Sequence, residues 1–173
     1  LAGPVGAAAV ILGPFRHPLI RDSKKLTPRQ RAFLHDLIME NALAVGIGTI
    51  DHTVIDACNI LNATRQAMVA AVAALTPGPD HLLIDALSLA LEIPQTPLVR
   101  GDDLSVSIAA ASIIAKVTRD RLMAGLHSMY PQYGFDRHKG YPTAEHRRLL
   151  AALGPCPVHR RSFAPVRHAL ADR

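Results

Sequence analysis

The spacing of apolar and polar positions along the chain predicts alternating strands and helices. Apolar runs of strand length predict strands at residues 4–12, 44–50 and 81–85. A proline-flanked segment at 94–99 is expected to end in a short edge strand. Between these segments, apolar residues recur every three or four positions, as they do in helices that bury one face. Strands that alternate with helices are typical of an α/β domain.

Capping residues mark where the predicted helices begin. Thr27, Pro28 and Gln30 form a capping box with proline at the first helical position. Asn59 is expected to cap a second helix, and a further helix is predicted over residues 143–153. The chain from 154 to 166 has no such pattern, and we expect it to be irregular.

The longest predicted helix runs from Ser105 to about Tyr130. Its first turns are apolar on nearly all sides, so we expect it to be buried. Asp102 and Asp103 precede it on a glycine-led turn. An acid in this position can simply cap the helix, or it can present a rigid carboxylate to a functional site. The pattern of this segment alone leaves both readings open.

Composition limits the possible classes of protein. The 173 residues are enough for one domain with its own core, expected over 1–173 with a basic C-terminal region at about 131–173. No apolar run reaches the length of a membrane span, and residues 1–12 lack the basic start of a signal peptide. Cys58 and Cys156 have no metal-ligand spacing. We therefore expect a cytoplasmic protein with reduced thiols and no membrane association.

The positive charge is concentrated in the second part of the chain. The formal net charge is +5, yet residues 1–118 carry 9 Lys and Arg against 10 Asp and Glu. From residue 119 onward the counts are 10 and 4, so the whole excess is C-terminal. Such an excess is expected where a protein contacts a polyanion such as a nucleic acid. A solvated basic surface without a partner is the alternative.

Two carboxylates are the main candidates for chemistry. Asp85 ends the predicted strand at 81–85, and sites in open α/β sheets assemble at such strand ends. Asp102 follows one loop and one edge strand later, so both side chains can reach the same end of the sheet. Two oxygen ligands near phosphate-binding groups suit Mg²⁺ or Mn²⁺ rather than Zn²⁺. In the alternative reading, Asp85 is a turn residue that caps the next segment.

Polar residues elsewhere are candidates for substrate binding. Ser23 and Lys24 lie just before a helix and could hold a phosphate, or they could belong to a solvated loop. The amide of Asn59 could reach a sugar or phosphate besides capping its helix. Tyr141 follows Lys139 and a glycine, and its ring could pack against a sugar or base.

Five segments in order resemble type 2 ribonuclease H, the ribonuclease HII family. They are DSKKL at 22–26, NILNAT at 59–64, RGDDLSVSIAAASIIAKVTRDR at 100–121, HKGYPT at 138–143 and GPCPVHRRSFAPV at 154–166. The resemblance covers essentially the whole chain. It implies a ribonuclease H-like fold, a mixed five-stranded sheet flanked by helices. The family's opening Asp-Glu-x-Gly-Arg-Gly segment, with the first, central strand, does not occur in this sequence.

The resemblance also implies an activity. Enzymes of this family are endonucleases that cut the RNA strand of RNA–DNA hybrids and nick duplex DNA 5′ of an embedded ribonucleotide, in DNA replication and repair. They use Mn²⁺ or Mg²⁺ and leave a 3′-hydroxyl and a 5′-phosphate. The implied partners are the hybrid and ribonucleotide-containing duplex DNA, bound by a monomer. A noncatalytic module that binds RNA–DNA duplexes is the alternative, because the absent opening segment would supply two further carboxylates.

The resemblance assigns roles to particular residues. Asp85 and Asp102 match two of the family's four catalytic, metal-binding carboxylates, while Asp103 falls one place off the motif. Lys24 resembles the family's phosphate-contacting lysine, and Tyr141 resembles the tyrosine that packs on the deoxyribose at the RNA–DNA junction.

Two departures from the family pattern give further expectations. Ala86 stands where the family usually has glycine, and alanine is tolerated there unless the backbone needs a positive φ. Without a central strand, its neighbours would keep unpaired backbone groups, so we expect this chain by itself to be poorly stable and nearly inactive.

Overall fold

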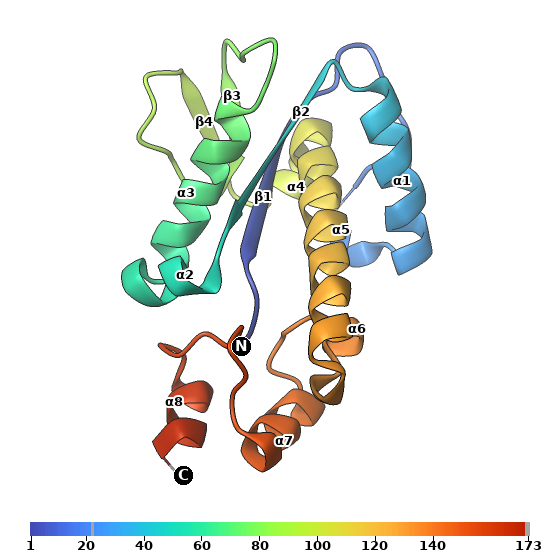
Figure 1. Ribbon diagram of the computed structural model, residues 1–173. Coiled ribbons are helices and arrows are strands. Elements are labelled where there is room, and N and C mark those ends of the chain that lie inside the picture. Colours follow the sequence, from blue (N-terminus) through green and yellow to red (C-terminus); the bar gives the residue numbers. More distant parts are fainter. Residues whose placement is uncertain (22, 172–173) are drawn as a thin grey trace. The chain divides into compact units, whose positions relative to one another are not determined.

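The computed structural model describes residues 1–21 and 23–171. The strands are β1 (Val5–Ile11), β2 (Ala44–Ile50), β3 (Leu82–Asp85) and β4 (Gln95–Leu98). The helices are α1 (Pro28–Asn41), α2 (His52–Cys58), α3 (Ile60–Ala73), α4 (Gly101–Leu104), α5 (Val106–Met129), α6 (Phe135–His138), α7 (Ala144–Leu153) and α8 (Ala164–Ala171) (Figure 1). Two 3₁₀ turns, η1 (Ser23–Lys25) and η2 (Pro131–Tyr133), complete the set.

The chain divides into two compact units. Unit 1 contains residues 1–5 and 50–64 together with the chain from 118 onward, and unit 2 contains residues 6–49 and 65–117. A single domain over the whole chain therefore stays a prediction. Within the described ranges, no helix is both long enough and apolar enough to cross a lipid bilayer.

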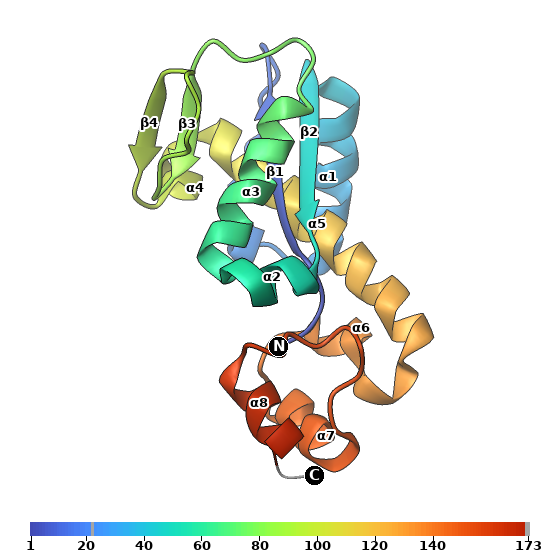
Figure 2. The ribbon, with the colours of Figure 1, turned by 60° about the vertical axis from the view of Figure 1, so that its left-hand side comes forward.

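Unit 2 consists of two small sheets and the helices that cover them. β1 pairs with β2, and the Leu43 N–H donates to the Ile11 carbonyl where one strand ends and the other begins, so these two strands run antiparallel. β3 pairs with β4 in parallel. One apolar cluster joins β1 and β2 to α1 and the first turns of α5, with Leu34, Ile38 and Ile113 fully buried in it (Figure 1). A second cluster packs β3 against α3 (Figure 2).

Small residues bring α3 unusually close to β2. A Cβ atom at Gly46 would lie 1.9 Å from the Ala71 carbonyl oxygen, and one at Gly48 would lie 2.0 Å from that of Ala67. Neither position can hold a larger residue without moving the helix, because real Cβ atoms do not approach a carbonyl this closely. The two glycines thus fix the distance between the helix and the strand.

Unit 1 has a core that mixes apolar and histidine side chains. Met123, Tyr133 and Phe135 are buried in one cluster, to which Ala2 also belongs. His138, His146 and His159 are buried as well, and the Phe135 ring contacts all three imidazoles. The backbone of Ala2 forms an antiparallel bridge with His159, which ties the beginning of the chain to the segment after α7.

Most elements expected from the sequence are present. The strand at 44–50 and the capping box of Thr27 are as predicted, Asn59 precedes α3, and Thr143 caps α7. The α/β class is confirmed, but the strands of the described chain pair as two separate sheets instead of one mixed sheet. β3 is buried on one face only, since Leu83 is 45% exposed.

Four helices were not expected. α2, α4 and α6 span seven residues or fewer, so their apolar positions repeat too few times to show a helical period. α8 was also missed, because it begins within the segment that we expected to be irregular and basic. Asp51, whose carboxylate accepts from the Thr53 N–H, is the one capping signal that could have marked α2.

Ala86, directly after β3, has a φ of 58°. This is the condition under which alanine is strained at this position, because its Cβ crowds the backbone in the left-handed region. The conformation is held by β4, because Asp85 is paired in parallel with Leu98 and the Ala86 N–H donates to the carbonyl of the same residue at 3.0 Å.

We therefore expect Ala86→Gly to stabilise the protein by about 1 kcal/mol, because the relief of strain exceeds the extra entropy of the unfolded chain. Urea unfolding measures the difference. Ala124→Gly, on an exposed face of α5, is the matched control and should destabilise by about 1 kcal/mol. A loss of stability in Ala86→Gly would show that the left-handed conformation is absent.

Burial lowers the pKa of His146 and of His159 from 6.5 to about 4. Both side chains lie in the core of unit 1 and so remain neutral near pH 7. Unfolded histidines bind a proton below about pH 6.5, whereas these folded ones do so only near pH 4. Protonation between these two values therefore favours the unfolded chain.

We predict that the free energy of unfolding decreases as the pH falls from about 6.5 to about 4. The slope is up to about 1.4 kcal/mol per pH unit for each of the two histidines. Denaturant titrations at several pH values measure it. His146→Asn removes one of the two histidines and should reduce the slope by its share, up to about 1.4 kcal/mol per pH unit. An unchanged slope would mean that His146 is not buried in its neutral form.

Candidate functional site

The predicted carboxylate pair lies at one end of the β3–β4 sheet, in unit 2. The parallel register sets Asp85 beside Leu98, and the chain then turns through Arg100 into α4, which carries Asp102. The Asp85 Oδ1 accepts a hydrogen bond from the Gly101 N–H at 3.0 Å. The Asp85 carboxylate thus contacts the residue directly before Asp102, and a metal site shared by the two acids stays a prediction.

Gly101 leaves room for the Ile108 side chain beside this contact. A Cβ atom at this residue would lie 2.5 Å from Ile108 Cδ1 and 3.5 Å from the Asp85 Cα. Arg100, just before it, adopts the left-handed conformation with a φ of 57°. The turn is thus packed tightly between the end of β3 and the start of α5.

The two acids of α4 have different environments. The Asp102 side chain is only 12% exposed, and its Oδ2 lies 3.6 Å from the Nζ of Lys24, whose side chain is 80% exposed. Asp103 forms an ion pair with Lys25 nearer the surface. Because a buried carboxylate needs a compensating partner, Lys24 offsets part of the desolvation of Asp102.

The turn that carries Lys24 is held by contacts within unit 2. The Ser23 hydroxyl is buried and shares a hydrogen bond of 2.7 Å with the Ser112 hydroxyl of α5. Arg31 donates from Nη1 to the Ser23 carbonyl at 2.8 Å. These contacts explain how Ser23 fixes the turn, while its role in phosphate binding stays a prediction. Asp22, the first residue of the DSKKL segment, lies outside the described residues.

The other two predicted binding residues, Asn59 and Tyr141, belong to unit 1. Asn59 ends α2 with a φ of 70°, and its Oδ1 accepts from the Asn62 N–H at 3.1 Å. It therefore caps α3, as predicted. The residue is exposed, so its amide remains accessible for the predicted contact with a sugar or phosphate.

Tyr141 is 51% exposed and lies on a tightly turned loop. Gly140 before it has a φ of 76°, and a Cβ atom there would lie 2.6 Å from the Ala2 carbonyl oxygen. The guanidinium of Arg119 lies 5.1 Å from the centroid of the Tyr141 ring, close enough for a cation–π contact. Arg119 also donates from Nε to the Pro4 carbonyl. One part of the ring is thus supported while another part faces solvent.

Several residues that hold these segments could not be identified from the sequence. Arg31 donates to the carbonyls of Ser23 and Leu26, and no sequence motif marks such a contact. Arg119 contacts the Tyr141 ring and the distant Pro4 carbonyl, for which no local pattern exists. Asp56 accepts from the N–H groups of Arg161 and Ser162 and from the Ser162 hydroxyl. Burial alone would raise the pKa of Asp56, but these hydrogen bonds outweigh it and hold the pKa below its usual value.

The chemistry of the carboxylate pair suits a hard divalent cation, which prefers oxygen ligands. Asp85 and Asp102 supply such oxygens at one turn. Within the described ranges, no group of three or more His, Cys, Asp or Glu side chains is arranged to hold a metal. The pair therefore fits the ligand type of such a cation, and its role in holding a metal stays a prediction.

The chain is similar to proteins of one family. A sequence model described as ribonuclease HII matches residues 1–166. The ribonuclease HII of Geobacter sulfurreducens is 56% identical over 175 aligned residues, which cover 99% of this chain and 80% of that protein. The crystal structure of the ribonuclease H2 from Pyrococcus horikoshii OT3 superposes with a TM-score of 0.74 at 21% identity, over 98% of both chains.

A more distant structure, Bst-RNase HIII in complex with Mn²⁺, has a TM-score of 0.62 at 19% identity and covers 99% of this chain and 65% of that one. These likenesses confirm the ribonuclease H-like fold, and the family match covers the segments that carry Asp85, Asp102 and Tyr141. The chain belongs to the ribonuclease HII family, the type 2 ribonucleases H.

Proposed function

We propose that this chain acts as a type 2 ribonuclease H, which cuts the RNA strand of RNA–DNA hybrids and nicks duplex DNA 5′ of an embedded ribonucleotide. The observation that carries the proposal is the turn in which the Asp85 carboxylate binds the Gly101 N–H directly before Asp102. It holds two oxygen ligands at one strand end, beside the ammonium group of Lys24. Family membership supplies the reaction class.

Asp85 and Asp102 would hold Mn²⁺ or Mg²⁺ through their carboxylate oxygens, and the manganese complex of the related fold supports this choice of ion. When bound, such an ion activates water and stabilises the leaving oxygen of a phosphodiester. The Gly101 N–H keeps one Asp85 oxygen oriented, so the other oxygen is available to the cation. Cleavage would leave a 3′-hydroxyl and a 5′-phosphate.

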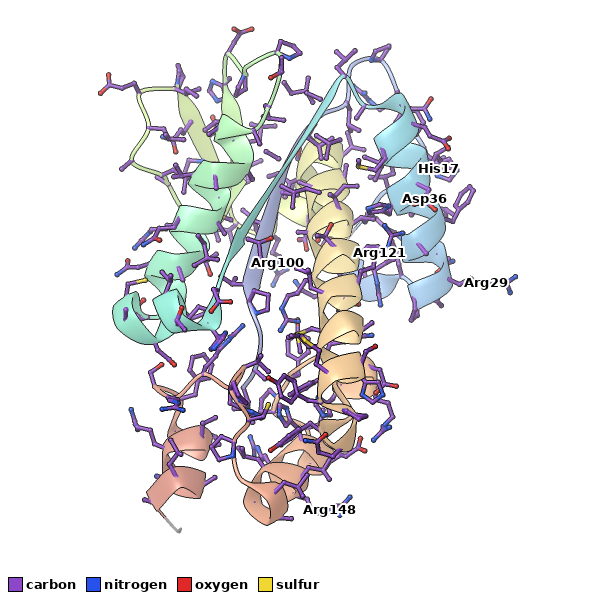
Figure 3. All side chains as sticks on the ribbon, in the orientation of Figure 1. His17, Arg29, Asp36, Arg100, Arg121 and Arg148 are labelled. Carbon is purple, nitrogen blue, oxygen red and sulfur yellow. The ribbon has the colours of Figure 1, made fainter. Side chains whose placement is uncertain are left out.

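Substrate contacts would come from both units. In unit 2, the exposed ammonium of Lys24 can leave Asp102 for a backbone phosphate when the acid binds a cation. In unit 1, the exposed ring of Tyr141 can pack against a sugar at the RNA–DNA junction, and Asn59 can contact the backbone. Arg148, which projects from α7 into solvent, belongs to the basic C-terminal region that would meet phosphates nonspecifically (Figure 3).

A noncatalytic duplex-binding module is the second candidate. The observation that favours it is the lack of a third acidic or histidine ligand beside Asp85 and Asp102 within the described ranges. Both candidates predict binding of a hybrid, and only the first predicts strand cleavage.

We predict that Asp85→Asn or Asp102→Asn in the full-length protein lowers cleavage of a single-ribonucleotide duplex by at least about 100-fold, because a carboxylate ligand is lost. The asparagine oxygen at residue 85 can still accept from Gly101, so folding should be preserved. Gel assays with Mn²⁺ measure nicking, and a band shift without metal measures binding, which should stay within about threefold.

Asp103→Asn is the matched control for Asp102→Asn, since it removes the neighbouring carboxylate and leaves the strand end unchanged. It should retain cleavage. Full turnover in Asp85→Asn or Asp102→Asn would remove that residue from the metal site, and binding without nicking in the unmodified protein would favour the noncatalytic module.

We predict that Tyr141→Ala lowers the preference for a single-ribonucleotide duplex over a uniform RNA–DNA hybrid by about tenfold, because a ring that packs on a nucleotide contributes about 1–3 kcal/mol. The measurement is the ratio of kcat/KM for the two substrates. Tyr130→Ala is the control, as Tyr130 packs against the core of unit 1. An unchanged ratio in Tyr141→Ala would limit Tyr141 to a packing role.

A further inference from the structure

A line of hydrogen bonds runs through the core of unit 1 from Cys156 to Tyr141. The Cys156 N–H donates to His159 Nδ1 at 3.0 Å. His159 Nε2 and His146 Nε2 lie 3.1 Å apart, and His146 Nδ1 lies 2.9 Å from the Tyr141 carbonyl oxygen. Both imidazoles are buried. We call this line the histidine relay.

The contacts along the histidine relay determine which ring nitrogens of His146 and His159 carry protons. A carbonyl oxygen only accepts, so His146 Nδ1 carries a proton and donates it to Tyr141. His159 Nδ1 lies 3.0 Å from the Cys156 N, which donates to it, and also 3.3 Å from the Cys156 carbonyl oxygen and 3.1 Å from the Cys156 Sγ. Because Nε2 of a neutral His146 is bare, the 3.1 Å contact between the two Nε2 atoms requires the proton of His159 on Nε2, which leaves His159 Nδ1 to accept from the Cys156 N–H. His159 then donates to the bare His146 Nε2, and both rings are neutral. The lowered pKa of both histidines agrees with this assignment.

His138 extends the cluster without joining the histidine relay. Its ring stacks on that of His146 with centroids 4.1 Å apart. Its Nδ1 accepts from the Gly140 N–H, and its Nε2 donates to the Tyr133 carbonyl. The nitrogens of all three imidazoles are therefore occupied by protein groups, which explains why three histidines and Cys156 do not form a metal site.

The histidine relay acts on the loop that carries Tyr141. The Tyr141 carbonyl accepts from His146 Nδ1 and from the Thr143 N–H, at 2.9 Å each. The Tyr141 N–H donates to the His138 carbonyl, also at 2.9 Å. The His146 N–H in turn donates to Thr143 Oγ1 at the start of α7. The backbone of Tyr141 is thus held by the buried side chain of His146, while the backbone N–H of the same residue is capped by Thr143 at the start of α7.

We infer that His146 and His159 are positioning residues, which hold the backbone of Tyr141 so that its exposed ring meets the RNA–DNA junction in one orientation. The inference rests on the proposed function of Tyr141. Arg119 contacts the ring itself, so the ring and the backbone are held by different groups. Without the bond from His146, the loop would keep its turn but lose the link between Tyr141 and the core.

Three substitutions of His146 separate its two hydrogen bonds. His146→Asn places an amide where Nδ1 lies and can still donate to Tyr141, whereas His146→Gln reaches His159 but not Tyr141. His146→Leu keeps bulk and makes neither bond. We expect His146→Asn to retain the preference for the single-ribonucleotide duplex, and the other two variants to lose it by several-fold, up to the loss seen in Tyr141→Ala.

The test measures the ratio of kcat/KM for the two substrates in each full-length variant, at a temperature where circular dichroism shows all of them folded. The double variant Tyr141→Ala with His146→Leu should have the ratio of Tyr141→Ala within about twofold, because His146 acts through Tyr141. If His146→Leu does not fold, His146→Gln serves in its place in this comparison.

The outcomes are distinguishable. An unchanged ratio in Tyr141→Ala rejects the proposed role of Tyr141 itself. A changed ratio in Tyr141→Ala with unchanged ratios in His146→Leu and His146→Gln rejects the positioning role. If the reductions of this ratio in Tyr141→Ala and His146→Leu multiply in the double variant, His146 acts through general stability instead. The same follows if His146→Asn lowers the ratio as much as His146→Leu does.

Discussion

The hydrogen bond from the Gly101 N–H to the Asp85 carboxylate is the constraint on which the candidate site depends. It joins the end of β3, where Asp85 lies, to Gly101, the first residue of α4. Asp102 is the next residue of that helix. Parallel pairing with β4 sets the position of Asp85, and the absence of a side chain at residue 101 leaves room for Ile108 of α5 beside the turn. The position of Asp85 relative to the turn that carries Asp102 therefore depends on backbone contacts as well as on the acids themselves.

The backbone conformations and the nearly buried carboxylate around this turn lower stability, and contacts within unit 2 offset part of that loss. Ala86 and Arg100 both adopt left-handed backbone conformations, which side chains other than glycine adopt at a cost of about 1 kcal/mol or more. Asp102 is nearly buried and depends on Lys24, which is itself held on a turn fixed by Arg31 and by the Ser23–Ser112 contact. Strain and charge are thus concentrated where the proposed chemistry takes place. That pattern is usual for functional sites, because pure stability would favour glycine at residue 86 and an apolar residue at 102.

The sequence predicted those features that have a local or periodic signal. Ala44–Ile50, the capping box of Thr27 and the cap at Asn59 follow from residues a few positions apart. The placement of the Asp85 side chain beside the turn that carries Asp102 follows from one loop and one edge strand. It could not predict that Ser23 would face Ser112, 89 residues away, or that Arg119 would lie over Tyr141, because such contacts exist only after folding. The short helices α4 and α6 were missed because four residues contain too little of a helical period.

The buried histidines show most clearly what a sequence alone leaves open. Residues 138, 146, 156 and 159 have the composition of a metal-ligand set, and spacing cannot distinguish such a set from a structural cluster. A metal-ligand set and a structural cluster differ in the group that each imidazole nitrogen contacts. The Tyr141 carbonyl requires a proton on His146 Nδ1, and the contact between the two Nε2 atoms then requires the proton of a neutral His159 on Nε2. In this arrangement every imidazole nitrogen already has a partner. Burying neutral imidazoles is tolerable only in such a complete network, since a single unpaired nitrogen would cost about 1–3 kcal/mol. The cluster therefore orders the backbone around Tyr141, and this ordering, more than the number of histidines, defines its role.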